Sequence, residues 1–241
     1  MKRADSASLP RLDSAETRRL SAPAVGLELW RIDLRFQPSP VMQAWLSPQE
    51  RARSARFVFE RDRRRFEAAH AALRQLLATR LGSTPQELEF REAQHGKPAL
   101  DETRHPRRCA FNLSHSDDEA IVAIADDGEI GVDVEVFRPM PDAETLARRN
   151  FSEEECTELE ATDRALRDLA FLTAWTRKEA CLKAIGSGLS IVPNTFTAGL
   201  HNGPRRTAIQ TAQGRVDVTV QSLCHEQQLL VAWARVEGLG P

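Results

Sequence analysis

An acidic pair lies within a short apolar segment near the middle of the chain. In the run Gly131–Val136, valines alternate with Asp133 and Glu135. Because successive side chains of a β-strand point to opposite faces, the valines share one face and the two acids share the other. The acids would then lie about 7 Å apart along the strand. The valines indicate that this strand packs on the core, whereas the acids fit either a functional site or a solvated strand face.

An acid and a base lie on one face of a predicted helix, in the segment WTRKEACLK. This face carries residues at i, i+4, i+7, i+8 and i+11, namely Trp175, Glu179, Leu182, Lys183 and Gly186. Glu179 and Lys183 therefore share the face of two inward-facing apolar side chains. This placement indicates a buried ion pair or a functional site. The alternative is a surface salt bridge, which would contribute only about 0.2–0.5 kcal/mol.

Small hydroxyl side chains flank a histidine at the end of another predicted strand, in the segment FNLSHS at residues 111–116. Ser114 and His115 are both able to bind a phosphate group by hydrogen bonding. A histidine at a strand end is also a common structural residue. The segment alone therefore leaves both interpretations open.

Lysine is rare in this chain and is concentrated in the candidate segments. Of 33 basic residues only four are lysine, at positions 2, 97, 178 and 183. Lys97 lies in a Gly-Lys-Pro turn, and Lys178 and Lys183 lie in the predicted helix. Because an ammonium group binds phosphate as a point charge, this distribution favours a phosphate-binding role for these lysines.

A basic stretch at residues 51–65 contains seven arginines against Glu60 and Asp62. The whole chain, by contrast, has 33 basic and 35 acidic side chains and a net charge of −2. A local basic surface indicates a polyanionic small molecule or an acidic protein partner, and an ordinary solvated helix face is the alternative. A nucleic-acid-binding protein is a less favoured reading, because the chain has no tyrosine to interleave with these arginines and this reading leaves the carboxylates unexplained.

The elements that must position the candidate residues are helices followed by strands, and this order occurs twice along the chain. In the first round we expect a strand at 27–36, helices from Ser47-Pro48 and over 62–81, and strands at 88–91, 110–114, 120–125 and 129–136. In the second we expect helices at 142–149, 152–160 and 164–185, and strands at 195–200, 216–221 and 229–236. This order predicts an α+β fold with two similar halves, 24–128 and 129–241, after a flexible extension at 1–23. Ser152 and Glu155 match a capping box.

The composition is that of a folded globular protein, with 41% hydrophobic and 28% charged residues. The four cysteines, at 109, 156, 181 and 224, lack the spacing of a metal site, so we expect reduced thiols in a cytoplasmic protein. No run approaches the roughly 18 apolar residues of a membrane span. We therefore expect neither membrane insertion nor secretion.

Taken together, four segments resemble the 4′-phosphopantetheinyl transferases: GKP at 96–98, FNLSHS at 111–116, GVDVE at 131–135 and WTRKEACLK at 175–183. Their order and spacing are similar to the long, two-half, surfactin-synthetase-activating type. The resemblance extends from about residue 46 to residue 189. It implies an enzyme that transfers phosphopantetheine from coenzyme A to a serine of an apo acyl or peptidyl carrier protein, with Mg²⁺, leaving 3′,5′-ADP.

The resemblance also implies roles for individual residues. The three carboxylates expected to hold Mg²⁺ are Asp133, Glu135 and Glu179. The pyrophosphate contacts would be Lys183, His115 and Ser114. The adenine and 3′-phosphate would be bound by Lys97, Arg51, Arg53 and Arg65. The candidate catalytic residues are Glu179, a possible general base, together with Lys183 and His115. The chain departs from the family pattern at Glu50, where relatives carry a lysine that contacts the 3′-phosphate.

Two further expectations follow from this resemblance. Short relatives build each site between two subunits, whereas this longer chain would supply both sides itself, which predicts a monomer with its site between the halves. A carrier-binding relative without transferase activity is the main alternative. Such a protein would normally have lost one of the three carboxylates, and none is lost here.

Overall fold

The computed structural model describes residues 16–21, 24–92, 96–105, 109–186, 190–223 and 229–238. Its first half contains a four-stranded antiparallel sheet in the order β1-β2-β6-β5. These strands are β1 (Thr17–Leu20), β2 (Leu27–Asp33), β5 (Ala110–Ser116) and β6 (Glu119–Ala125). The other elements of this half are α1 (Pro40–Trp45), α2 (Pro48–Ser54), α3 (Glu60–Leu81), the 3₁₀ turn Pro85–Glu87 and a hairpin of β3 (Phe90–Glu92) and β4 (Pro98–Leu100).

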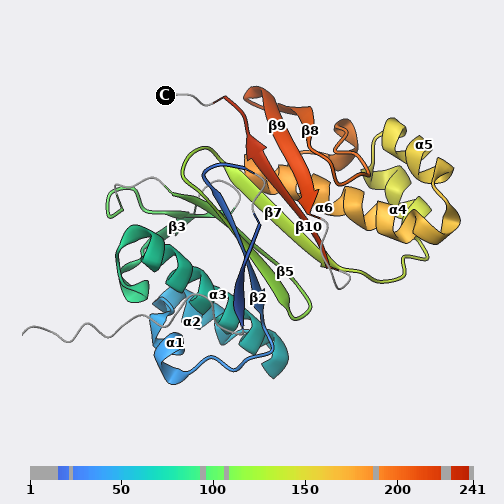
Figure 1. Ribbon diagram of the computed structural model, residues 1–241. Helices are drawn as coiled ribbons and strands as arrows, with labels where there is room; N and C mark the ends of the chain where they lie inside the picture. Colours follow the sequence, from blue (N-terminus) through green and yellow to red (C-terminus); the bar gives the residue numbers. More distant parts are fainter. Residues whose placement is uncertain are drawn as a thin grey trace, which may run out of the picture.

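The second half repeats this plan with a second antiparallel sheet, in the order β7-β10-β9-β8. Its strands are β7 (Ile130–Val136), β8 (Arg205–Thr211), β9 (Gly214–Leu223) and β10 (Leu229–Val236). Its helices are α4 (Ala143–Asn150), α5 (Glu153–Ala161) and α6 (Arg167–Ile185), with 3₁₀ turns at Arg164–Leu166 and Pro193–Thr195. The α+β fold with two halves of helices on antiparallel sheets is therefore confirmed (Figure 1).

Strand alternation divides the core into layers. On β6, Val122 and Ile124 pack with α3, whereas Ile121 and Ala123 face the second sheet. The second sheet does the same, because β10 directs Val231 toward the first sheet and its neighbouring alanines toward α6. The order of layers is thus α3, first sheet, second sheet, α6, with α4 and α5 beside the N-terminal part of α6 (Figure 1).

One expected feature, the flexible extension at residues 1–23, is wrong for residues 17–20. These residues form β1, which pairs with β2. Leu20 is buried in the core between the sheets, and its burial fixes this strand, whose exposed residues Arg18 and Arg19 are polar. Residues 1–15 and 22–23 lie outside the described part of the chain.

The strand expected at 195–200 is also wrong. Phe196, Ala198 and Leu200 are buried at every second position, which imitates a strand, but the segment is a loop after a 3₁₀ turn. Its backbone amides at 198 and 199 bond to the side chain of Glu155 instead of to a neighbouring strand. The strand in this region is β8, whose mostly polar edge position hid it from the pattern.

Other expectations about the chain are met. The capping box of Ser152 and Glu155 is present at the start of α5. Cys109, Cys156 and Cys181 form no disulfide within the described residues, and Cys224 lies outside them. Within the described ranges, the helices are too short or too polar to cross a membrane.

Candidate active site

The predicted site residues meet where β5, β7 and α6 come together. β5 is the edge strand of the first sheet and β7 is the edge strand of the second. Alternate side chains of β5 bridge to β7: the amide oxygen of Asn112 accepts from the Val132 N–H at 2.8 Å, and Ser114 donates to Asp133 at 2.9 Å. Asn112 and Ser114 thus connect the two sheets and fix the position of Asp133 on β7.

A glycine allows α6 to lie against β7 at this point. A Cβ atom on Gly131 would lie 2.1 Å from the carbonyl oxygen of Ala180 and 2.3 Å from the amide nitrogen of Ala184. Both are backbone atoms of α6, so no side-chain adjustment would relieve the clash. Gly131 therefore lets α6 place Glu179 and Lys183 beside the acids of β7.

Asp133 is the centre of the cluster. Its Oδ1 atom accepts hydrogen bonds from the Lys183 ammonium at 2.6 Å and from the Ser114 hydroxyl at 2.9 Å. Lys183 also donates to the Ser114 Oγ at 2.8 Å. The Oδ2 atom of Asp133 is buried and has no hydrogen-bond partner among the described residues. Burial raises the pKa of Asp133, although the charge of Lys183 acts in the opposite direction.

The other two acids lie within electrostatic reach of Asp133. Burial, followed by the negative charge of Asp133 and a smaller effect of Glu135, raises the pKa of Glu179. The Glu179 carboxylate has no hydrogen bond or ion pair with any described residue. Glu135 uses its Oε2 atom to accept from Ser116 at 3.0 Å and from Arg138 at 2.7 Å. The cluster therefore carries more negative charge than its partners balance.

These acids suit a cation that is bound together with an anionic ligand. Among the described residues, no three metal-ligating side chains are arranged to enclose a metal ion by themselves. Mg²⁺ does not require such an enclosure, because it keeps several waters and is bound by one or two carboxylates plus substrate phosphates. The unpartnered Oδ2 of Asp133 and the mutual repulsion of Asp133 and Glu179 are features that a cation would relieve.

Lys97 also reaches this region, from the first half of the chain. Its ammonium donates to the Glu129 carboxylate at 2.8 Å, to the Ile130 carbonyl at 3.0 Å and to the Ala184 carbonyl at 3.3 Å. An ammonium has three N–H groups, so all of them have protein partners. Lys97 connects the GKP turn to the start of β7 and the end of α6, and these contacts favour a structural role for Lys97 over the predicted contact with a phosphate.

Each of the three predicted arginines contacts a part of the protein outside the Asp133 cluster. Arg51 donates to the carbonyl of Leu46, and Arg53 lies 5.4 Å above the ring of Phe66. Arg65 binds the carboxylate of Asp118 at 2.8 Å, in the turn between β5 and β6. The basic stretch is therefore in part a set of structural contacts.

His115 is separated from the cluster by the strand geometry. It is exposed, and alternation directs its side chain to the side of β5 opposite to Ser114. The structure brings together Ser114, Asp133, Glu135, Glu179 and Lys183, whereas His115 makes no hydrogen bond within the described residues.

Glu50 has a structural environment that explains the departure from the family pattern. It is buried, caps α2 with Ser47, and bonds to His70 Nδ1 at 2.8 Å and to Arg74 Nε at 2.7 Å. Burial acts to raise its pKa, but the hydrogen bonds from His70 and Ser47 and the charge of Arg74 lower the pKa of Glu50 to about 2. This carboxylate holds α2 on α3 and is not a phosphate ligand.

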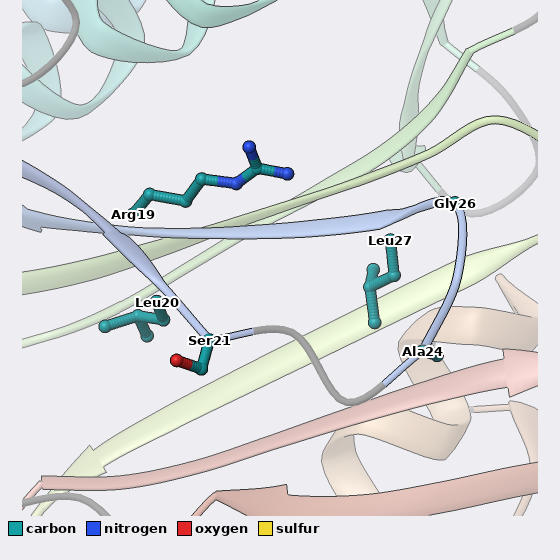
Figure 2. A pocket seen from close by; sticks show the side chains of 6 residues that line it. All are labelled: Arg19, Leu20, Ser21, Ala24, Gly26 and Leu27. Atoms are coloured by element: carbon teal, nitrogen blue, oxygen red, sulfur yellow. The ribbon is translucent and has the colours of Figure 1, made fainter.

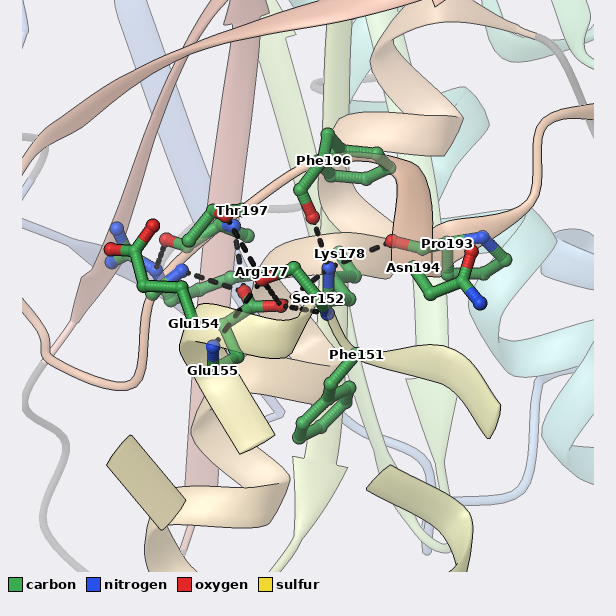
Figure 3. Close-up of polar contacts among 12 residues, drawn as sticks. Phe151, Ser152, Glu154, Glu155, Arg177, Lys178, Pro193, Asn194, Phe196 and Thr197 are labelled. Atoms are coloured by element: carbon green, nitrogen blue, oxygen red, sulfur yellow. Dashed lines mark hydrogen bonds and ion pairs between the residues drawn. The ribbon is translucent and has the colours of Figure 1, made fainter. Parts of the chain in front are cut away.

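Lys178 is not a phosphate ligand either, in contrast to the expectation from lysine scarcity. Its ammonium pairs with Glu155 at 2.7 Å, and both side chains are at most 1% exposed (Figure 3). It also donates to the carbonyls of Pro193 at 2.8 Å and Phe196 at 2.5 Å. This buried pair fixes the loop after α6 against α5, so its role is structural.

A pocket on the first half is unrelated to the cluster. It lies at the connection between β1 and β2, and none of the predicted site residues lines it (Figure 2). Three further polar residues, Asn112, Ser116 and Arg138, contact β7 and were not predicted from the sequence. The first two share the face of Ser114 at every second position, a signal that the segment FNLSHS already contains.

Comparisons with known proteins agree with this geometry. Residues 129–234 match the family described as the 4′-phosphopantetheinyl transferase superfamily, and residues 37–127 match the family described as 4′-phosphopantetheinyl transferase, N-terminal. The first match contains the acids of β7 and the residues of α6, and the second contains β5. The two matches adjoin between β6 and β7.

Individual relatives show the same similarity over longer stretches. The chain is 40% identical to the 4′-phosphopantetheinyl transferase HetI of a Nostoc species over 217 residues, which cover 89% of each protein. It is 40% identical over 151 residues to a putative 4′-phosphopantetheinyl transferase of a Synechocystis species, covering 63% of this chain and 61% of that protein. It is 28% identical to Sfp of Bacillus subtilis over 66% of this chain and 68% of that protein. The chain therefore belongs to the 4′-phosphopantetheinyl transferase superfamily.

Proposed function

We propose that this protein transfers the 4′-phosphopantetheine group of coenzyme A to a serine of an apo acyl or peptidyl carrier protein, with Mg²⁺, and releases 3′,5′-ADP. The observation that carries the proposal is the cluster around Asp133. There a lysine and a serine hold one oxygen, the second oxygen is buried without a partner from any described residue, and two further carboxylates lie nearby. Relatives named 4′-phosphopantetheinyl transferases support the reaction class.

The reaction forms a bond between the serine oxygen and the phosphorus that carries pantetheine, and breaks the pyrophosphate link to 3′,5′-ADP. Mg²⁺, when held by Asp133, Glu135 and Glu179, would neutralise the charge that develops on the leaving phosphate. Lys183 is partly exposed, and its ammonium is able to donate to a pyrophosphate oxygen. Ser114 lies beside Lys183 and is able to do the same.

The serine of the carrier protein must lose a proton during the transfer. We assign the proton to Glu179, directly or through a water molecule, because its carboxylate is partly exposed and has no partner among the described residues. His115 would act only if the ligand approaches the opposite side of β5.

One chain would supply the whole site. Lys97 and Ser114 come from the first half, and Asp133, Glu179 and Lys183 come from the second. We infer a monomer that binds one coenzyme A, and we expect each half to be inactive when it is expressed alone. Light scattering of the full chain tests this inference, and a mass above that of one 27.0 kDa chain contradicts it.

The experiment for the function is transfer to purified apo carrier proteins, followed by their intact mass. With coenzyme A and Mg²⁺ we expect one phosphopantetheine increment per carrier. EDTA should abolish it, and added Mg²⁺ should restore it. A protein that binds carriers but modifies none, in a panel that a known transferase modifies completely, would instead be the carrier-binding relative without transferase activity.

A further inference from the structure

The two acids of β7 are held in the same way. On Asp133, Oδ1 accepts from the β5 serine Ser114 at 2.9 Å and from the cation of Lys183 at 2.6 Å. On Glu135, Oε2 accepts from the β5 serine Ser116 at 3.0 Å and from the cation of Arg138 at 2.7 Å. In each case the serine and the cation bind the same oxygen. The second oxygen of each carboxylate has no partner among the described residues.

From this repeated pattern we propose that Ser116 and Arg138 are positioning residues for Glu135. They would hold one carboxylate oxygen and thereby present the other to the cation of the active site. The proposal rests on the proposed function, in which Glu135 binds that cation. A free glutamate side chain samples many rotamers, so fixing one oxygen in advance reduces the entropy lost on binding.

Ser116 is well placed for this role because its own position is fixed on two sides. Its hydroxyl also accepts from the Val136 N–H at 3.3 Å, so it holds the backbone of β7 next to Glu135. The residue after it, Asp117, has a φ of 51°, in the left-handed region. The adjacent Asp118 is bound by Arg65 at 2.8 Å. The turn that carries Ser116 is thus anchored to α3.

Arg138 holds Glu135 from the segment that directly follows β7, at the same end of the strand as Ser116. Its guanidinium donates to Glu135 and, at 3.3 Å, to the carbonyl of Val136. Its side chain is 50% exposed, whereas that of Lys183, its counterpart on Asp133, is 30% exposed. A solvated ion pair is weaker than a partly buried hydrogen bond to a charge, so Ser116 should contribute more than Arg138.

The test compares Ser116→Ala, Ser116→Thr and Arg138→Gln with the wild type. The readouts are the Mg²⁺ concentration for half-maximal transfer, and Mn²⁺ affinity measured by calorimetry with coenzyme A bound, which needs no turnover. For Ser116→Ala we expect the Mg²⁺ concentration for half-maximal transfer to rise about tenfold and the Mn²⁺ affinity to fall about tenfold. This is the lower end of the effect of removing a residue that holds a metal ligand. Arg138→Gln should raise the Mg²⁺ concentration for half-maximal transfer, and lower the Mn²⁺ affinity, by about twofold to threefold.

Matched controls separate positioning from folding. Ser116→Thr keeps the hydroxyl and should restore Mn²⁺ affinity to near the wild-type value. Arg148→Gln removes a solvated arginine of α4 that pairs with Glu144 at 3.7 Å, and it should change neither readout. The KM for coenzyme A should stay constant in all variants that remain folded, and Arg138→Gln tests the proposal if Ser116→Ala does not fold.

The proposal is overturned if Ser116→Ala lowers the melting temperature but leaves the Mg²⁺ and Mn²⁺ dependence unchanged, or if Ser116→Thr fails to restore it. It is also overturned if Arg138→Gln behaves as Arg148→Gln does. Absence of transfer by the wild type would instead refute the proposed function, because the Mn²⁺ titration does not depend on transfer.

Discussion

Asp133 combines two features that rarely occur on one carboxylate. One oxygen is bound by a lysine and a serine, and the other is buried without a partner in the part of the chain that the structure describes. A buried polar atom without a partner costs about 1–3 kcal/mol, so a fold retains it where a ligand will complete it. Glu50 is the opposite case, because hydrogen bonds and an arginine satisfy it within the protein.

Glu50 therefore gives a prediction for stability at the residue scale. Its pKa is about 2 in the folded protein and 4.5 in the reference state. A lowered carboxylate pKa stabilises the folded state above pH 4.5, and this contribution is lost as the pH falls toward 2. Glu50→Gln should lower the melting temperature by several degrees at pH 7, because the buried Arg74 loses its ion pair.

Thermal unfolding of the wild type and Glu50→Gln between pH 7 and pH 3 checks this prediction. The difference in melting temperature should shrink below pH 4.5, because Glu50 becomes protonated there in the unfolded wild type, whereas in the folded protein it stays ionised until the pH approaches about 2. A difference that stays constant over this range would contradict the lowered pKa.

At the scale of elements, the contact of α6 with β7 decides whether the site exists. Only a residue without a side chain fits at position 131, because backbone atoms of α6 occupy the space of a Cβ. The helix then brings Lys183 onto Asp133. Gly131, Ala180 and Ala184 form this contact, and they control activity by placing Lys183 and not by touching a substrate.

Gly131→Ala tests this contact, and Gly203→Ala is its matched control. We expect Gly131→Ala to destabilise the protein by at least about 1–3 kcal/mol, the usual cost of overpacking, and to lower transfer strongly although every site residue is retained. A Cβ on Gly203 would meet nothing within 4 Å, so that variant should behave as the wild type. Chemical denaturation and transfer rates measure both effects, and equal behaviour of the two variants would contradict the account.

Several of these elements follow from sequence patterns, and others do not. Alternation in GVDVE predicted a strand with both acids on one face, and helical spacing placed Glu179 with Lys183, because local geometry alone determines such faces. The bridging of β5 to β7 by Asn112 and Ser116 depends on two sheets meeting, which no local pattern contains. The loop at 196–200 imitated a strand because its burial against α6 and the second sheet also produced alternation.

At the scale of the whole molecule, the two halves meet through their edge strands and through Lys97. This lysine crosses from the first half to carbonyl groups on β7 and α6 of the second. Each carbonyl would lose a donor if the ammonium were removed. Lys97 thus links the two halves of the chain, which contribute the two sides of the proposed site.

Lys97→Met should therefore lower the melting temperature by several degrees, since hydrogen bonds to a charged group are worth about 1.5–3 kcal/mol each. Transfer from coenzyme A and from dephospho-coenzyme A should fall by the same factor. An unchanged melting temperature with a selective loss for coenzyme A would show instead that Lys97 is available to the 3′-phosphate.

The most direct test of the central claim is the transfer rate of Asp133→Asn at saturating coenzyme A and Mg²⁺. Asparagine keeps the shape of the side chain and an oxygen for Ser114 and Lys183, but it removes the charge that would hold the cation. We expect the rate to fall by at least about a hundredfold, or ~2.7 kcal/mol, with little change in melting temperature. A variant that folds and transfers phosphopantetheine at the wild-type rate would contradict the assignment of Asp133 and with it the proposed mechanism.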